Sequence, residues 1–158
     1  MTGAPVLVAG LGHELRGDDG IGLAVARALA ERTPSELDAH TMPGEPVALL
    51  ELWRDRDTVI VIDAMHTGRM RAGSTLRFDA HRQPLPETLR RRATTHGVGL
   101  AETIELGRVL DRLPRRLIVL AVAGRHFDTG TGLSSELQAA VPRLADAVAA
   151  EAARLQTS

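Results

Sequence analysis

Hydrophobic positions along this chain follow two alternating patterns, short continuous runs and longer segments with a period near 3.6 residues. The short runs predict five β-strands, at residues 5–9, 37–41, 58–62, 74–78 and 117–122. The run at 58–62 is rich in β-branched apolar residues, which is typical of a central strand buried on both faces. In 74–78, Leu76 and Phe78 alternate with polar residues, which indicates an edge strand.

The periodic segments lie between the strands and predict helices from about residue 20, over 46–53, over 97–113 and over 134–155. In the third helix the expected inward-facing residues are Leu100, Ile104, Gly107 and Leu110. In the last helix we expect a kink or a break at Pro142, because proline has no backbone N–H to donate. Residues 80–95 fit no periodic pattern and are expected to form a long loop.

Strands that alternate with helices predict an α/β fold, a three-layer domain in which a mostly parallel, twisted sheet of about five strands carries helices on both faces. The length of 158 residues is that of one compact domain, and neither a repeat nor a linker divides residues 1–158. No segment has the roughly 20 apolar residues of a membrane helix, and no secretory leader pattern is present. We therefore expect a single soluble domain in the cytoplasm.

Composition removes several classes of chemistry. The chain has no cysteine and no lysine, which excludes disulfides, thiolate zinc sites, cysteine nucleophiles and lysine Schiff bases. A net charge of −1 and only three aromatic residues disfavour a nucleic-acid-binding surface. There is no G-x-S-x-G motif for a serine hydrolase, and Ser134 or Ser135 is expected to cap the last helix instead.

Acidic residues follow two of the predicted strands. Asp18 and Asp19 come after the first strand, and Asp63 directly follows the strand predicted over 58–62. In an open α/β sheet, ligands bind beyond the carboxyl ends of the strands, where the strand order switches. The sequence therefore predicts that these carboxylates lie on one edge of the sheet.

The segment after the first strand begins like a dinucleotide-binding turn with Gly10 and Gly12, but Leu15 stands where the third glycine belongs. Asp18 and Asp19 would also repel a phosphate at the start of the next helix. A cation site fits this acidic pair better than a nucleotide. Helix capping is the alternative interpretation, and it accounts for only one of the two aspartates.

His96 precedes the third helix, in a position where a lone histidine is more often a surface residue than a ligand. Together, Asp19, Asp63 and His96 would supply oxygen and nitrogen ligands from three separate turns, a set suited to nickel or zinc with open coordination positions. His66 and His13 are secondary candidates. We do not expect Asp19 or His96 to belong to the core.

At these residues the sequence resembles the hydrogenase maturation proteases. The similar segments are Gly10-Leu11-Gly12-His13, Asp18-Asp19-Gly20-Ile21-Gly22, Val61-Ile62-Asp63-Ala64, Thr95-His96-Gly97-Val98-Gly99-Leu100 and Gly132-Leu133-Ser134. Each segment is short, but their order and spacing agree with the family over nearly the whole chain. The resemblance therefore implies one hydrogenase-maturation-protease-like domain.

The resemblance implies that Asp19, Asp63 and His96 contact a metal and take part in catalysis. The implied enzyme is an aspartyl endopeptidase that removes the C-terminal extension of a nickel-loaded [NiFe] hydrogenase large-subunit precursor. The nickel would be carried by the precursor, and no nucleotide, nucleic acid or membrane would take part. A monomer is expected, although no motif specifies the oligomeric state. Either a carboxylate or the metal would activate the attacking water.

Three departures from the family pattern concern the choice of hydrogenase and of peptide bond. His13 replaces an asparagine, Met42-Pro43-Gly44-Glu45 replaces a glycine-rich segment, and Gly124-Arg125 stands where the family has Pro-Glu. Two other functions stay open on the same residues. One is a non-catalytic, metal-dependent binding or chaperone protein, and the other is a self-contained zinc metallohydrolase with Asp63, His66 and His96 as ligands.

Overall fold

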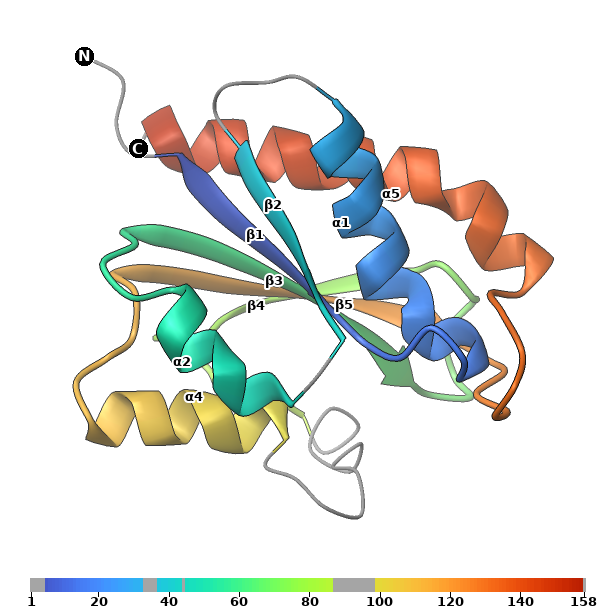
Figure 1. Cartoon of the computed structure of the whole chain (residues 1–158), viewed down its shortest axis with the longest axis horizontal. Coiled ribbons are helices and arrows are strands. Elements are labelled where there is room, and N and C mark those ends of the chain that lie inside the picture. Colours follow the sequence, from blue (N-terminus) through green and yellow to red (C-terminus); the bar gives the residue numbers. More distant parts are fainter. Residues whose placement is uncertain (1–4, 33–36, 44, 87–98, 158) are drawn as a thin grey trace.

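The computed structural model of the chain describes residues 5–32, 37–43, 45–86 and 99–157 (Figure 1). Its elements are β1 (Val6–Leu11), η1 (Gly17–Gly20), α1 (Ile21–Glu31), β2 (Leu37–Met42), η2 (Pro46–Ala48), α2 (Leu49–Leu52), β3 (Thr58–His66), β4 (Thr75–Asp79), α4 (Leu100–Val109), β5 (Arg116–Gly124) and α5 (Ser135–Thr157).

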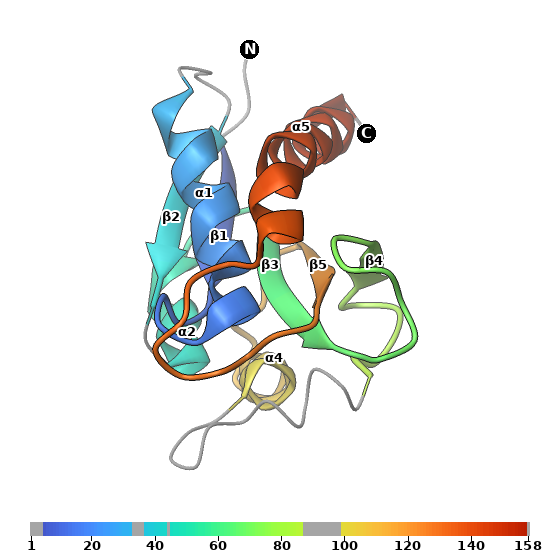
Figure 2. The same ribbon diagram turned by 90° about the vertical axis from the view of Figure 1, so that its right-hand side faces the viewer.

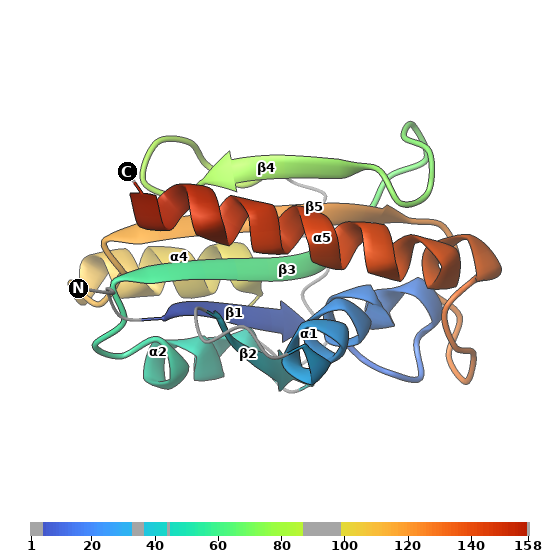
Figure 3. The same cartoon turned by 90° about the horizontal axis from the view of Figure 1, so that it is seen from above.

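The strands form one five-stranded sheet in the order β2-β1-β3-β5-β4. The first four strands run parallel, and β4 pairs antiparallel with β5 at the edge. Figure 3 shows β4 running against its neighbours. The predicted α/β fold, with a mostly parallel sheet and an edge strand near 74–78, is confirmed.

Two hydrophobic cores lie on opposite faces of the sheet. One core joins the sheet to α1 and α5, and the other joins it to α2 and α4. Alternate residues of β3 face the two cores, Val61 on the α2 and α4 side and Ile60 and Ile62 on the α1 and α5 side. This two-sided burial is the reason that β3 is apolar at successive positions instead of alternating with polar ones.

The strand order switches between β1 and β3. From β1 the chain passes through α1 to β2 on one side, and then through α2 to β3 on the other side of β1. The ladder between β1 and β3 ends at Gly10 and Ile62, while β3 continues to pair with β5 as far as His66. The predicted end of this strand at residue 62 is therefore wrong, because the β5 ladder extends it by four residues.

Two expectations for the helices are also wrong. Leu110 does not face inward but is 48% exposed, because α4 ends at Val109 and Asp111 has a left-handed backbone with φ of 54°. The break expected at Pro142 is absent, since residues 135–157 form one continuous helix. Buried Leu137 and Leu144 hold that helix to the sheet on both sides of the proline. Of the expected 80–95 loop, residues 87–95 lie outside the described part of the chain.

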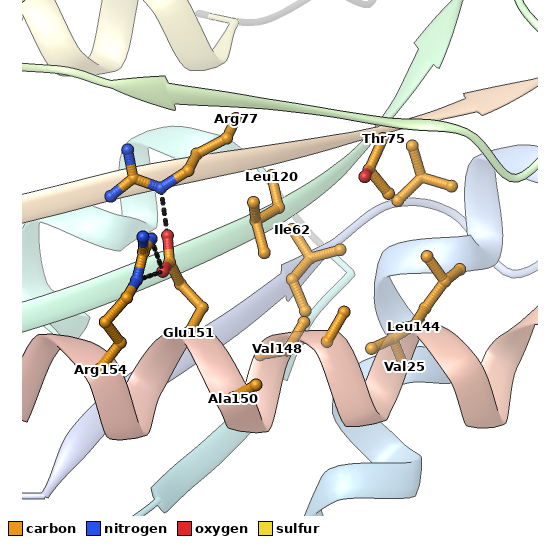
Figure 4. A pocket seen from close by; sticks show the side chains of 12 residues that line it. Val25, Ile62, Thr75, Arg77, Leu120, Leu144, Val148, Ala150, Glu151 and Arg154 are labelled. Atoms are coloured by element: carbon orange, nitrogen blue, oxygen red, sulfur yellow. Dashed lines mark hydrogen bonds and ion pairs between the residues drawn. The ribbon is translucent and has the colours of Figure 1, made fainter.

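A groove of about 430 Å³ runs between α5 and β4 (Figure 4). Its floor is apolar, with Ile62 and Leu120 among the lining residues. At one end Glu151, which is nearly buried, pairs with Arg77 and Arg154. In the described part of the chain no helix is long and apolar enough to cross a membrane.

Candidate functional site

Three glycines let the segment after β1 lie directly against the ends of the strands. A Cβ atom on Gly22 would lie 2.6 Å from the carbonyl oxygen of Ile62, and one on Gly12 would lie 2.0 Å from that of Asp19. A Cβ on Gly10 would lie 2.0 Å from the carbonyl oxygen of Gly22. The glycines that resemble a nucleotide-binding turn therefore serve close backbone packing at the switch between β1 and β3.

Asp19 lies in η1, which contacts β3, and only 2% of it is exposed. The expectation that Asp19 is outside the core is wrong, because the glycine contacts draw η1 into the sheet edge. The N-cap of α1 is Gly20, and no side chain caps that helix. Helix capping thus does not account for either aspartate of the pair.

Asp18 is fully buried and binds a distant loop. Its carboxylate accepts backbone N–H groups from Ser134 at 2.8 Å, Arg125 at 2.9 Å and His126 at 3.1 Å. Burial raises the pKa of Asp18, but these hydrogen bonds outweigh it and hold the pKa below its usual value. This role of Asp18 could not be predicted from the sequence, because its partners lie more than 100 residues further along the chain. The only signal was an acidic doublet in which one member had no local function.

Asp63 lies on β3 one residue beyond the end of the β1 ladder, at the open switch point. It is 6% exposed and is on the strand face that α2 and α4 cover, between Val61 and Met65. Burial raises the pKa of Asp63 to about 7, although a 2.9 Å hydrogen bond from the backbone N–H of Ala64 opposes the shift. A carboxyl group of this kind exchanges a proton near neutral pH.

His66 points away from Asp63. The two residues are three positions apart in one strand, and side chains alternate between the faces of a strand. His66 accordingly packs its ring 4.7 Å from the ring of Phe127, which is partly buried against the core on the α1 and α5 face. The two side chains therefore do not converge on one ion, and His66 lies outside the site that Asp63 faces.

The remaining candidate ligand, His96, lies outside the described part of the chain. Within the described residues, no three histidine, cysteine, aspartate or glutamate side chains gather closely enough to hold a metal ion. The helix that follows His96 begins at Leu100, which packs with Met65 in the core on the face of Asp63. The segments that carry Asp19 and Asp63 lie at one edge of the sheet, as expected for the two aspartates.

Of the departures from the family pattern, Gly124 has a structural reason. A Cβ on Gly124 would lie 2.7 Å from the Cβ of Asp18, so the end of β5 needs a glycine to admit that aspartate. Half-buried His13 lies in the turn before η1, where its carbonyl oxygen accepts the Arg16 N–H at 3.3 Å. In the segment 42–45, Met42 ends β2, while Gly44 is outside the described residues.

Comparisons with known proteins agree on one family. The family model described as hydrogenase maturation protease matches residues 24–151, a range that contains Asp63 and His96 but not Asp19. The hydrogenase 2 maturation protease of Escherichia coli is 24% identical over 148 residues, which are 92% of this chain and 89% of that protein.

Solved structures share the fold. The hydrogenase maturating endopeptidase HybD from Escherichia coli superposes with a TM-score of 0.75 at 22% identity, covering 93% of this chain and 91% of its own. The [NiFe] hydrogenase maturation protease HybD from Thermococcus kodakarensis has a TM-score of 0.67 at 23% identity, with coverage of 94% and 99%.

Proposed function

The chain belongs to the hydrogenase maturation protease family, and on this basis we propose that it is the endopeptidase that removes the C-terminal extension of a [NiFe] hydrogenase large-subunit precursor. The observation that carries the proposal is the buried carboxyl group of Asp63 at the switch point of the sheet, with its pKa near 7. Buried, shifted carboxyl groups at the carboxyl edge of an α/β sheet are typical of functional sites.

In this proposal the precursor carries nickel, and the protease recognises it through Asp19, Asp63 and His96. Asp19 and Asp63 are 2% and 6% exposed, so ionising both at one sheet edge carries a desolvation cost. A precursor that brings a divalent ion to this edge would offset that cost. An empty precursor would not, so the buried carboxylates favour the loaded form.

Two routes to the attacking water are consistent with this site. Asp63 ionises close to neutral pH, which suits a general base and supports the aspartyl assignment. Nickel would instead polarise the scissile carbonyl, and in that case its charge would hold Asp63 ionised. The pH dependence of cleavage separates the routes, because a general base produces a rise in rate near the pKa of Asp63.

The experiment that tests the proposal is a cleavage assay with the large-subunit precursor that is encoded with this protein, in nickel-loaded and nickel-free form. Mass spectrometry of the intact precursor would show loss of a C-terminal fragment from the loaded form alone. A verified loaded precursor whose mass stays unchanged would overturn the proposal. Binding without cleavage would favour the non-catalytic binding or chaperone function.

Matched variants connect the activity to the site. Asp19→Asn and Asp63→Asn each keep the size of the side chain and remove its charge, and both should abolish cleavage of the loaded precursor. Asp57→Asn is the control, because Asp57 is exposed just before β3, at the amino end of the strands and far from the candidate site. Cell fractionation of the tagged protein tests the further proposal that processing takes place in the cytoplasm.

A further inference from the structure

Two loops that are far apart in the sequence are joined at the edge of the sheet that carries the candidate site. They are the β1 loop, residues 12–16, and the β5 loop, residues 125–134. Figure 2 looks onto this edge and shows the orange segment after β5 passing beside the blue segment after β1. The joined loops border the proposed site directly, since Asp19 follows the β1 loop by three residues.

Backbone hydrogen bonds tie the β5 loop to the β1 loop and to the start of η1, which follows the β1 loop directly. Gly130 N–H donates to the Leu15 carbonyl at 2.6 Å, Gly17 N–H to Thr131 at 2.8 Å and Asp18 N–H to His126 at 2.6 Å. The three bonds that the Asp18 carboxylate accepts are added to these. This number of bonds fixes the loops relative to each other, so that their shape is set before any partner arrives.

The approach of the loops also depends on glycine. Gly17 has a left-handed backbone with φ of 59°, and a Cβ there would lie 2.2 Å from the carbonyl oxygen of His126. A side chain at Gly124 would meet the Cβ of Asp18 at 2.7 Å. Glycines on both sides of the contact therefore allow the two segments to approach closely.

On this fixed frame Leu15 is 69% exposed. A single exposed leucine is common on protein surfaces and by itself indicates nothing. Leu15 differs because its own carbonyl oxygen is held by the β5 loop and because it lies four residues from Asp19. In protein interfaces, anchor residues are often apolar side chains that a rigid backbone holds beside the site.

The surroundings of Leu15 add charge. Arg16 and Arg125 are both exposed, and neither has an ion-pair partner among the residues that the structure describes. Glu14, the nearest acidic residue in sequence, pairs with Arg27 at 2.5 Å. The exposed surface of the joined loops therefore carries Leu15 as an apolar anchor, the guanidinium groups of Arg16 and Arg125, and one exposed carboxylate, Asp128. The excess of cations over anions favours a partner segment that carries apolar and acidic side chains.

We propose that the joined β1 and β5 loops are the docking surface for the precursor, that Leu15 anchors an apolar side chain of it, and that Asp18 is the positioning residue that holds this surface. The occupant is the precursor segment next to the cleaved bond, with an acidic residue near its apolar one. This inference rests on the proposed function. It adds a second feature of the substrate that the protease recognises besides nickel, namely the apolar and acidic segment next to the cleaved bond.

The test compares variants of the full-length protein for binding of the nickel-loaded large-subunit precursor, by calorimetry, and for the KM and kcat of its cleavage. Leu15→Asp should weaken binding and raise KM by about tenfold, with kcat nearly unchanged. Leu15→Ala should raise KM by about fivefold. Val109→Asp is the matched control, because Val109 is 81% exposed at the end of α4, before the amino end of β5. It should change neither constant.

The role of Asp18 is tested by a double-mutant cycle with Asp18→Asn and Leu15→Asp. If Asp18 acts by holding Leu15 in place, the double variant should bind only slightly worse than the worse single variant. An unchanged KM for Asp18→Asn, or strictly additive effects of the two substitutions on KM, would show that Asp18 does not act through Leu15 and would overturn its positioning role. Normal binding by Leu15→Asp would overturn the anchor. Either result can occur while the wild-type protein cleaves normally. Wild-type protein that neither binds nor cleaves the precursor would overturn the proposed function and the docking surface together.

Discussion

Gly22 lies against the carbonyl oxygen of Ile62, with only 2.6 Å between that oxygen and the position of a Cβ on the glycine. This contact brings the first turn of α1 to the last residue of β3 that pairs with β1. Asp63 is the next residue of β3. The glycine therefore controls how closely the two acidic segments of the candidate site approach each other.

Replacing Gly22 with alanine should destabilise the protein by about 1–3 kcal/mol, because the new methyl group meets backbone oxygens that cannot rotate away. Urea unfolding followed by the fluorescence of Trp53, the only tryptophan, measures the change. Gly68→Ala is the control, since no heavy atom lies within 4 Å of the position of its Cβ. Equal stability of the two variants would contradict the packing role of Gly22.

Stability should fall as pH rises through the titration of Asp63. Burial raises the pKa of this group to about 7 from an unfolded value of 3.8, so the folded protein holds the proton more tightly over that interval. The free energy of unfolding should therefore decrease between pH 4 and pH 7, by ~4 kcal/mol at most, and level off above it. Asp63→Asn should abolish this decrease. A variant that loses stability as steeply as the wild-type protein would show that another group is responsible.

Glu151 should have the opposite pH dependence. Burial raises the pKa of Glu151, but hydrogen bonds from Arg77 and Arg154 outweigh burial and lower it below the usual value. The contribution of Glu151 to stability is present at pH values above its pKa in the unfolded protein. It is lost as the pH falls through its lower pKa in the folded protein. Glu151→Gln should cost about 1–3 kcal/mol at pH 7 and little near pH 3 in urea unfolding. Glu136→Gln, on the exposed side of the same helix, should have little effect at either pH.

Changing His66 to alanine should leave cleavage within about threefold of wild type, because His66 faces the side of β3 away from Asp63 and is exposed. The self-contained zinc metallohydrolase predicts the contrary result, loss of activity together with loss of tightly bound zinc. Cleavage of the loaded precursor and metal content by mass spectrometry distinguish the two. This experiment addresses the alternative that the sequence left open.

Trp53→Phe should lower stability without affecting catalysis. The Trp53 indole donates to the Arg112 carbonyl at 2.8 Å and is 1% exposed, between α2 and the start of β3. Phenylalanine would leave the carbonyl without this donor and a small void beside it, at a cost of about 2 kcal/mol. Thermal unfolding by circular dichroism gives the loss of stability, and kcat for the precursor should be unchanged.

Sequence periodicity predicted the sheet and its helices because the three central strands β1, β3 and β5 are buried on both faces, while the helices are buried on one. It placed the end of β3 too early, since Asp63 and His66 look like loop residues, while their pairing with Ala121 and Gly124 keeps them in the strand. It placed Leu110 inside because the apolar period runs past the point where Asp111 ends the helix. In both cases a contact distant in sequence or a single backbone conformation outweighs the local pattern.

For the candidate site, the sequence predicted that Asp19 and Asp63 share one edge of the sheet, since that follows from the strand order alone. It did not predict the burial of Asp19, which depends on close contacts of Gly12 and Gly22 with backbone atoms. Nor did it predict that Asp18 binds the β5 loop. The ligand role of His96 stays a prediction, because this residue is outside the described part of the chain.

The bond from Ser134 to Asp18 spans 116 residues of sequence. At a synthesis rate of roughly 5–20 residues per second, Ser134 is added to the chain about 6–23 s after Asp18. The long separation also raises the contact order of this region, so the loops join late in folding. A nascent chain that already contains Asp19 and Asp63 therefore lacks the joined loops until α5 begins to form, which delays binding of the precursor until the fold is nearly complete.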